Sequence, residues 1–307
     1  TVSLAAQLAT TPLSIYYFNQ FPNFFLLTNL VAIPLTSIIL YTGIAFLAFS
    51  FIPLLSQLLS SCLYFLIKAL NNSVMFVEGL PFSLSQALYL STPALLFISA
   101  GIVSLAFFIH LKNNRWAYIM LLCFIIASAD SLLHKYHNLA QEKIIVYHTR
   151  QGTSIDVING RQSFLITDSL IYTNPSLIGY QIDKNKIANS ISDQTVYDYK
   201  ASVNKQPCFR LNNGLLQAAN TTLLILMPEH KQLSSRQPID VDYVIINRKS
   251  KMKAEILAPR IKFKTLILDA SLTNWYHNYW KTKCEENHWD YWSIKDKGFL
   301  EILPGTN

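Results

Sequence analysis

The seven histidines are the first residues to test for metal chemistry: His110, His134, His137, His148, His230, His277 and His288. No two of them stand in the H-x-H-x-D-H or H-E-x-x-H arrangement that brings several ligands onto one metal ion. A G-x-S-x-G elbow, a Walker loop and a G-x-G-x-x-G turn are also missing from the sequence. The residues therefore predict no catalytic site, no bound metal and no cofactor.

Aromatic and basic residues alternate near the end of the chain. Lys281, Lys283, Lys295 and Lys297 lie among the aromatic side chains of Trp275, Tyr276, Tyr279, Trp280, Trp289, Tyr291 and Trp292. Aromatic rings stack the bases of a single strand while lysines hold its phosphates, which makes Trp280 and Trp292 candidates for nucleic-acid contact. The alternative, which weighs more, is that these rings pack a helix onto a sheet.

Four polar or helix-breaking residues lie in the apolar first part of the chain: Gln7, Pro12, Asn29 and Pro34. Polar groups inside a bilayer are costly unless they are paired, so they often mark a transport pathway. One interpretation is an opened helix that lines a polar channel, with these four residues along it. The other is a hydrogen bond between helices combined with a packing kink.

The distribution of charge divides the 307 residues into two parts. Only 14% of the chain is charged, and the first 133 residues contain just Lys68, Glu78, Lys112, Arg115 and Asp130. This pattern predicts a helical membrane domain over residues 1–133 and a soluble domain over residues 142–307. The formal net charge is +7, of which the first part contributes +1, and the basic surplus of the second part fits a polyanionic partner without demanding one.

Runs of about 20 apolar residues predict membrane-crossing helices. The expected spans are Phe24–Phe51, the more polar Leu54–Leu70, Thr92–Leu111 and Trp116–Leu132. The opening stretch Val2–Phe25 is too polar for a span exposed to lipid, so we expect a broken, re-entrant or in-plane helix there. The basic loop Lys112–Arg115 predicts a cytoplasmic turn and an exported soluble domain, although Lys135, Lys143 and Arg150 favour the opposite orientation.

Short apolar runs in the second part predict strands, and their alternation with helical segments from Asp242 onward indicates β-α-β units, so we expect an α/β domain with a mixed sheet. Asn159-Gly160 predicts a hairpin between two of the strands, and residues 174–205 are expected to be mostly loop. The expected strands are 144–148, 154–158, 164–167, 222–227, 242–247, 265–269, and 289–294 paired with 298–303. Helices are expected at 249–257 and 274–287.

Three runs near the start of the chain form a distinctive pattern: Leu8-Ala9-Thr10-Thr11-Pro12-Leu13, Tyr17-Phe18-Asn19-Gln20-Phe21, and Leu27-Thr28-Asn29-Leu30-Val31-Ala32-Ile33-Pro34-Leu35. Together they resemble the competence domain of the ComEC family of DNA-uptake proteins. The resemblance implies a polytopic region of a bacterial inner (plasma) membrane. Fuller family members carry further helices and an OB-like domain upstream, so we expect this chain to be the C-terminal part of a longer protein.

The soluble domain resembles the metallo-β-lactamase-like domain that ends many members of this family. Residues 144–153 resemble its opening strand and V-G-Q-G-D turn, with Gln151 and Gly152 kept and Thr153 in place of the aspartate. The H-x-H-x-D-H block is absent from 172–205, and Asn247 and Arg248 replace the histidines of an H-H-G-S element. A two-metal site needs converging His and Asp ligands, so we expect a degenerate fold that binds no metal and is not an enzyme.

Basic residues near the vacated metal site are candidates for phosphate contact. Arg150, Arg248 and Lys249 are these candidates, and a solvated basic turn is the alternative. The resemblance implies a fragment of a channel that carries single-stranded DNA into the cytoplasm during natural transformation. Its partners would be the DNA, the lipid bilayer and other competence proteins. The alternatives are a membrane protein whose exported domain binds a ligand or a protein, and a membrane-anchored metal-dependent nuclease.

Overall fold

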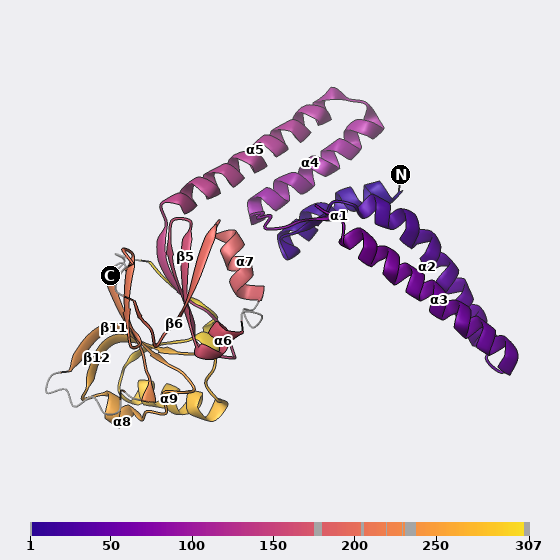
Figure 1. Cartoon of the computed structure of the whole chain (residues 1–307). Coiled ribbons are helices and arrows are strands. Elements are labelled where there is room, and N and C mark those ends of the chain that lie inside the picture. The colour runs from indigo at the N-terminus through magenta and orange to yellow at the C-terminus, as the bar shows by residue number, and fades with distance from the viewer. Residues whose placement is uncertain are drawn as a thin grey trace. The chain divides into compact units, whose positions relative to one another are not determined.

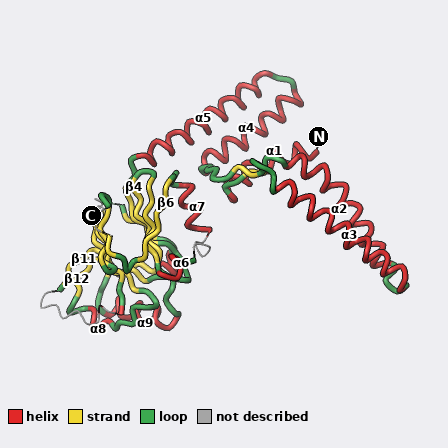
Figure 2. The backbone as a smooth tube through the Cα atoms, in the orientation of Figure 1, coloured by secondary structure: helices red, strands yellow, loops and turns green. Residues whose placement is uncertain are grey.

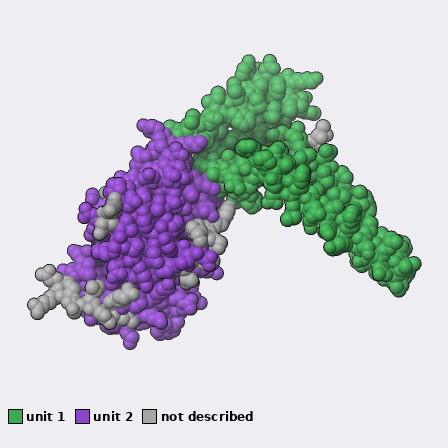
Figure 3. All heavy atoms as spheres, in the orientation of Figure 1, with its two compact units in different colours: residues 1–133 green, residues 134–307 purple. Residues whose placement is uncertain are grey.

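The structure is a computed structural model that describes residues 2–174, 180–203, 206–218, 220–228, 230 and 238–303. The chain divides into two compact units, residues 1–133 and 134–307, which Figure 3 shows in different colours. The first unit is helical, and the second contains two large β-sheets with short helices.

Five helices and one small strand pair make up the first unit. The helices are α1 (Val2–Phe18), α2 (Phe25–Ala48), α3 (Pro53–Glu78), α4 (Thr92–Leu111) and α5 (Asn114–Leu139), whose end from His134 onward belongs to the second unit. Helices α2 to α5 are each long and apolar enough to cross a membrane. They correspond to the four predicted spans, and α3 extends beyond its predicted end at Leu70 to Glu78.

Neither of the prolines in the first two helices breaks its helix. We expected a broken, re-entrant or in-plane helix at Val2–Phe25; the broken helix is wrong, because α1 is continuous through Pro12, and α2 is likewise continuous through Asn29 and Pro34. An apolar environment offers the backbone no hydrogen-bond partner except itself, so a helix remains the favoured conformation even across a proline. Helix α1 ends at the buried Asn19, which has a φ of 56° and donates a side-chain hydrogen bond to the carbonyl oxygen of Leu88.

The second unit is built on a five-stranded sheet and a seven-stranded sheet. The five-stranded sheet has the order β14-β3-β4-β5-β6, with β3 (Glu142–Val146), β4 (Ser154–Asn159), β5 (Gln162–Thr167), β6 (Asp193–Asp198) and β14 (Leu300–Ile302). The seven-stranded sheet has the order β13-β12-β11-β10-β9-β8-β7. Its strands are β7 (Ser202–Val203), β8 (Phe209–Asn212), β9 (Leu215–Ala218), β10 (Thr221–Ile225), β11 (Ile239–Ile246), β12 (Ile261–Leu268) and β13 (Asp290–Ser293).

The two sheets pack face to face around the main hydrophobic core. Alternate residues of each strand point to opposite faces, and the shared core takes Ile155 and Ile166 from one sheet and Ile245 and Ile267 from the other. The outer face of the seven-stranded sheet packs on α8 (Ala254–Leu257) and α9 (Asn274–Glu286). The outer face of the five-stranded sheet packs on Ile182 of α7 (Tyr180–Ala188). The unit therefore has four layers in the order helix, sheet, sheet, helix (Figures 1 and 2).

Strands β11 to β13 confirm the predicted parallel β-α-β units. β12 pairs in parallel with both β11 and β13, with α8 and α9 in the crossovers, and β10 also pairs in parallel with β11. The helix expected at 249–257 is shorter than predicted, because only Ala254–Leu257 is helical. The predicted pairing of 289–294 with 298–303 is wrong, since β13 extends the seven-stranded sheet and β14 pairs with β3 in the other sheet.

Two hairpins follow Asn-Gly pairs, one predicted and one missed. The turn after Asn159 joins β4 to β5, with Gly160 at a φ of 57°. Asn213 and Gly214 have φ values of 45° and 82°, as a type I′ turn requires, and they join β8 to β9. The stretch 174–205, expected to be mostly loop, contains α7, β6 and β7, while its parts at 175–179 and 204–205 lie outside the described residues. The short helix α6 (Ser169–Thr173) lies immediately before it.

Candidate nucleic-acid interface

A cavity of about 600 Å³ lies where strands from both sheets end. Asp168 follows β5, Asn247 follows β11, and Ser271 lies just after β12, while Thr153 immediately precedes β4. We call this cavity the basic pocket, because four cationic residues line it: Arg150, Arg248, Lys249 and Lys251. The structure thus brings together Arg150, Arg248 and Lys249, which the sequence predicted as phosphate contacts. It adds Lys251, which the sequence analysis did not predict.

A hydrogen-bonded network of polar side chains lies under the pocket. The Thr153 hydroxyl donates to Asp269 Oδ2 at 2.5 Å, and Ser271 donates to the same oxygen at 3.0 Å. Asn247 Nδ2 donates to Thr153 Oγ1 at 3.1 Å. Asp269 is fully buried, and burial raises the pKa of its carboxyl group to about 6. Because residues 153, 247 and 269 come from three chain segments, this network ties the two sheets together below the cavity.

One of the four cations is held by an acid in the pocket wall. Lys249 Nζ lies 2.5 Å from Asp168 Oδ1, and the Asp168 side chain is only 4% exposed. Asp168 also lies close to the backbone of the turn between β3 and β4, since a Cβ atom at Gly152 would lie 2.8 Å from the Asp168 Cβ. A residue with a side chain at 152 would push this acid aside, which explains why glycine suits the position.

The remaining cations of the basic pocket have no acidic partner among the residues that the structure describes. Within the described ranges, no ion pair joins Arg150, Arg248 or Lys251 to a carboxylate. All three residues are exposed. A cavity with four cations and two carboxylates, one of them buried below it, favours an anion such as a phosphate group.

The two tryptophans predicted to contact nucleic acid have different environments. Trp280 is fully buried between α9 and the seven-stranded sheet, so its prediction as a nucleic-acid contact is wrong in this structure. The reason is the helical period, which turns Trp280 and Cys284 toward the sheet. Trp292 is partly buried against the main core, and Lys297 Nζ lies 4.9 Å from the centroid of its ring.

The candidate channel residues lie on α1 and α2. Pro12 is buried, Gln7 and Asn29 are half-buried, and Pro34 is exposed. Both helices are continuous at these positions, so the prediction of an opened helix is wrong, and the four residues lie on intact helices.

Elsewhere in this unit, Ser91 caps α4 by accepting from the Ala94 backbone N–H, and its hydroxyl donates to Asp130 Oδ2 on α5. The one acidic residue of α5 is therefore paired.

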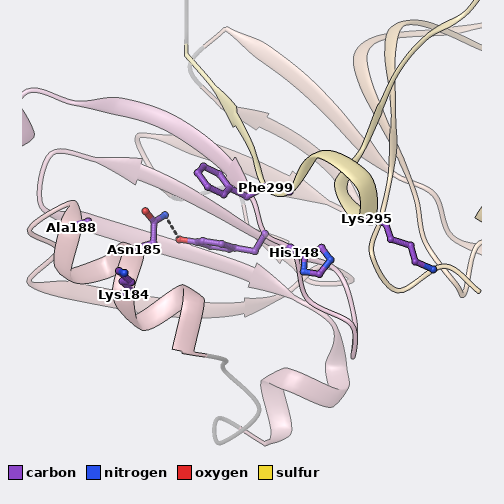
Figure 4. A pocket seen from close by; sticks show the side chains of 8 residues that line it. His148, Lys184, Asn185, Ala188, Lys295 and Phe299 are labelled. Atoms are coloured by element: carbon purple, nitrogen blue, oxygen red, sulfur yellow. Dashed lines mark hydrogen bonds between the residues drawn. The ribbon is translucent and has the colours of Figure 1, made fainter. Parts of the chain in front are cut away.

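A second cavity, of about 490 Å³, lies between α7 and the chain segment before β14. Figure 4 shows Lys184, Asn185 and Ala188 on one side and Phe299 on the other. Asn185 Nδ2 donates to the Tyr147 hydroxyl at 2.9 Å (Figure 4), and that hydroxyl donates to the buried Asp156 at 3.2 Å. Burial raises the pKa of both Tyr147 and Asp156 above their usual values. This network attaches α7 to the sheet and serves the fold.

Sequence reasoning missed Asp269 as the centre of the polar network. Its signal was present, because Asp269 directly follows a buried strand in the same way that Asn247 follows the neighbouring parallel strand. Side chains after adjacent parallel strands meet at one edge of the sheet. No comparable signal exists for Thr153, because its partner lies 116 residues away on the other sheet.

The fold consists of four helices that are long and apolar enough to cross a membrane, followed by an α/β domain with a basic pocket. Residues 144–304 match the family model of the ComEC C-terminal domain, and residues 1–115 match the model described as Competence protein. The chain therefore belongs to the ComEC family of competence DNA-uptake membrane proteins, which confirms the resemblance found in the sequence. No curated protein and no solved structure gives a match.

Proposed function

We propose that this chain is part of an inner-membrane channel that carries single-stranded DNA into the cytoplasm during natural transformation. The observation that carries the proposal is that both units match models of one competence family. The proposal places the soluble unit on the exported side, on the strength of the basic loop between α4 and α5. Lipid and other competence proteins are its expected partners.

The basic pocket supports a role in binding the polyanion. DNA binding draws much of its free energy from cations that displace counterions from phosphates. Arg150, Arg248 and Lys251 are exposed and lack acidic partners among the described residues. The soluble unit also carries most of the chain's formal charge of +7.

We also infer that the soluble unit binds DNA without cleaving it and has a degenerate metallo-β-lactamase-like fold. Two packed sheets covered by helices on both outer faces suit such a fold. The donor set suits the loss of metal, because Asn247 and Arg248 stand where the resemblance implies histidines. Across the part of the chain that the structure describes, no three His, Cys, Asp or Glu residues form a metal-binding group.

The proposal is tested by following labelled DNA into the source cell. Deleting the parent gene should abolish entry of the label into the cytoplasm while DNA still binds outside, and the intact gene should restore entry. Uptake that survives the deletion would refute the transport role. The favoured alternative would then be a membrane protein whose soluble domain binds another ligand.

A variant of the same gene tests the membrane path. Asn29→Leu, expressed at matched protein level, should reduce DNA entry if the half-buried Asn29 lies along the route. Thr36→Leu is the matched control, because it also replaces a polar side chain by leucine and Thr36 is exposed on the same helix. Normal uptake by Asn29→Leu would assign Asn29 to helix packing.

Cleavage is tested with the purified full chain and a labelled oligonucleotide in Mg²⁺, Mn²⁺ or Zn²⁺. We expect the oligonucleotide to stay intact in all three metals. Metal-dependent cleavage that is lost on Asp269→Asn would refute the proposed absence of nuclease activity.

A further inference from the structure

We infer that the basic pocket and an aromatic pocket beside it form one binding site for a single-stranded nucleotide step. A phosphate lies among the cations, and an unpaired base lies against the rings of Trp275, Tyr276 and Tyr279. The inference rests on the proposed function for the choice of DNA as the polymer. It adds a location and a mode of recognition.

The aromatic pocket has a volume of about 410 Å³ and lies at the start of α9. Trp275, Tyr276 and Tyr279 line it, with Arg248, Lys251 and Lys253. The ring planes are nearly parallel, at 12° between Trp275 and Tyr276 and 14° between Trp275 and Tyr279. Parallel rings on one face of a helix provide a platform on which a flat base can stack.

Hydrogen bonds fix the two tyrosines of this platform. The Tyr276 hydroxyl donates to the Met252 carbonyl oxygen at 2.5 Å. The Tyr279 hydroxyl accepts from the Ala254 backbone N–H at 3.2 Å and lies 3.3 Å from Glu255 Oε2, to which it donates. The two tyrosine rings are therefore already ordered before a ligand binds, which lowers the entropic cost of binding.

Trp275 differs from its neighbours because the fold does not bury it. The side chain is 76% exposed, whereas Trp280, five residues later, is fully buried. A large exposed aromatic ring beside several cations is typical of a surface that binds nucleic acid.

The two pockets are continuous through shared residues. Arg248 and Lys251 line both of them. Lys251 has a φ of 42°, in the left-handed region, where the chain turns between β11 and α8. Cations placed between a base platform and a polar cavity suit a phosphate next to a stacked base.

The site favours single strands over duplexes. Stacking on Trp275 requires a base face that no neighbouring base covers, and a duplex covers both faces. Cationic contacts alone would bind either form.

Affinity is tested with the full chain in detergent and a fluorescein-labelled dT12 oligonucleotide, followed by anisotropy. Trp275→Ala should weaken binding about tenfold through the lost stacking. Lys251→Asn should flatten the slope of log affinity against log salt by about 0.7, the value for one phosphate contact with a single strand. Asparagine is chosen because it tolerates a positive φ.

Matched controls separate this site from general basicity. Phe299→Ala removes an exposed ring that lines the other cavity, and Lys262→Gln removes an exposed cation at the opposite end of β12. Both should bind dT12 like the unchanged protein. Equal losses in control and site variants, or no loss in Trp275→Ala and Lys251→Asn, would overturn the inference.

Location is tested by photo-crosslinking the full chain to an oligonucleotide that contains 5-iodouracil. We expect the crosslink on the peptide that contains Trp275, Tyr276 and Tyr279, and little crosslinking to the same sequence in a duplex. A crosslink confined to other peptides, or an equal yield with the duplex, would refute the site.

The outcomes distinguish this inference from the proposed function. If gene deletion abolishes DNA entry while Trp275→Ala and Lys251→Asn bind dT12 normally, the site is refuted and the transport role stands. If the variants lose affinity while deletion leaves entry intact, the site stands for single strands and the transport role is refuted.

Discussion

Lys249 Nζ lies 2.5 Å from Asp168 Oδ1, across a sequence separation of 81 residues. Lys249 follows β11 of the seven-stranded sheet, and Asp168 follows β5 of the five-stranded sheet. The ion pair therefore joins the ends of the two sheets in the wall of the basic pocket. It also leaves Arg150, Arg248 and Lys251 as the cations of the pocket that can meet a ligand.

The ion pair should contribute measurably to the stability of the second unit. Lys249→Met should lower the free energy of unfolding by about 2 kcal/mol, because it leaves the nearly buried Asp168 carboxylate without its partner. Asp168→Asn should relieve part of that loss in the double variant. A double-mutant cycle in urea, followed by tryptophan fluorescence, should give a coupling of about 1 kcal/mol. Strictly additive effects would mean that the pair contributes no coupling energy.

Asp269 should make the second unit less stable as pH rises from about 4 to about 6. Burial raises its folded-state pKa to about 6, above the ordinary 3.8, so in this range the folded state binds the proton more tightly than the unfolded state. The stabilisation present below pH 4 is then lost as pH rises, by about 3 kcal/mol. Asp269→Asn should show a decline smaller by about that amount in urea titrations at pH 4, 5, 6 and 7.

The burial of Asp156 acts in the same direction, because it raises that pKa as well. The effect of pH is therefore compared between the unchanged protein and its variants, with Asp240→Asn as the control at an exposed position. An unchanged pH profile in Asp269→Asn would show that the Asp269 carboxyl group is not responsible for the decline.

The tryptophans of α9 should separate stability from binding. Trp280→Ala should lower the free energy of unfolding by about 3–5 kcal/mol, because it empties a fully buried site between helix and sheet. Trp275→Ala should change it by less than about 0.5 kcal/mol, because that ring is exposed. Urea unfolding of both variants measures the difference. Similar losses would contradict the assignment of the two rings to core and surface.

Gly214 should tolerate no side chain. It has a φ of 82°, and a Cβ atom there would lie 2.9 Å from the Ile225 carbonyl oxygen and 2.9 Å from the Met227 Cε. Gly214→Ala should therefore cost about 2–4 kcal/mol from backbone strain and overpacking. Gly298→Ala is the control, with a φ of 85° and no atom within 4 Å of the added Cβ. Thermal unfolding should show the larger loss at 214, and the reverse order would contradict the packing of this hairpin.

Ser91 should stabilise the helical unit through its two hydrogen bonds. Ser91→Ala removes the cap of α4 and the donor to Asp130, so we expect a loss of about 1–2 kcal/mol. Ser91→Thr keeps the hydroxyl and should retain most of the stability. Thermal unfolding in detergent, followed by the helical circular dichroism signal, compares the two variants. An equal loss in both would show that the hydroxyl is not what matters.

Local pattern was sufficient for the features that depend on neighbours along the chain. The four candidate spans follow from long apolar runs with few charged residues, since each charge placed in a bilayer adds its own free-energy cost. The hairpin at Asn159-Gly160 follows from the φ values that its turn needs, and the same signal at Asn213-Gly214 was available and overlooked. The parallel order of β11, β12 and β13 follows from strands alternating with helical segments.

Only the tertiary structure decided which distant segments meet. The sequence of a short strand such as β14 does not specify which strand it pairs with, so its pairing with β3 instead of β13 depends on the packing of the whole sheet. The helical period placed one tryptophan of α9 in the core and left Trp275 outside, although both stand in one aromatic run. Arg150 and Lys249 lie in turns nearly a hundred residues apart, and they line one pocket because two sheets pack with their strand ends together. Sequence spacing determines a helix or a turn, whereas a binding site assembled from several strand ends exists only once the sheets have packed.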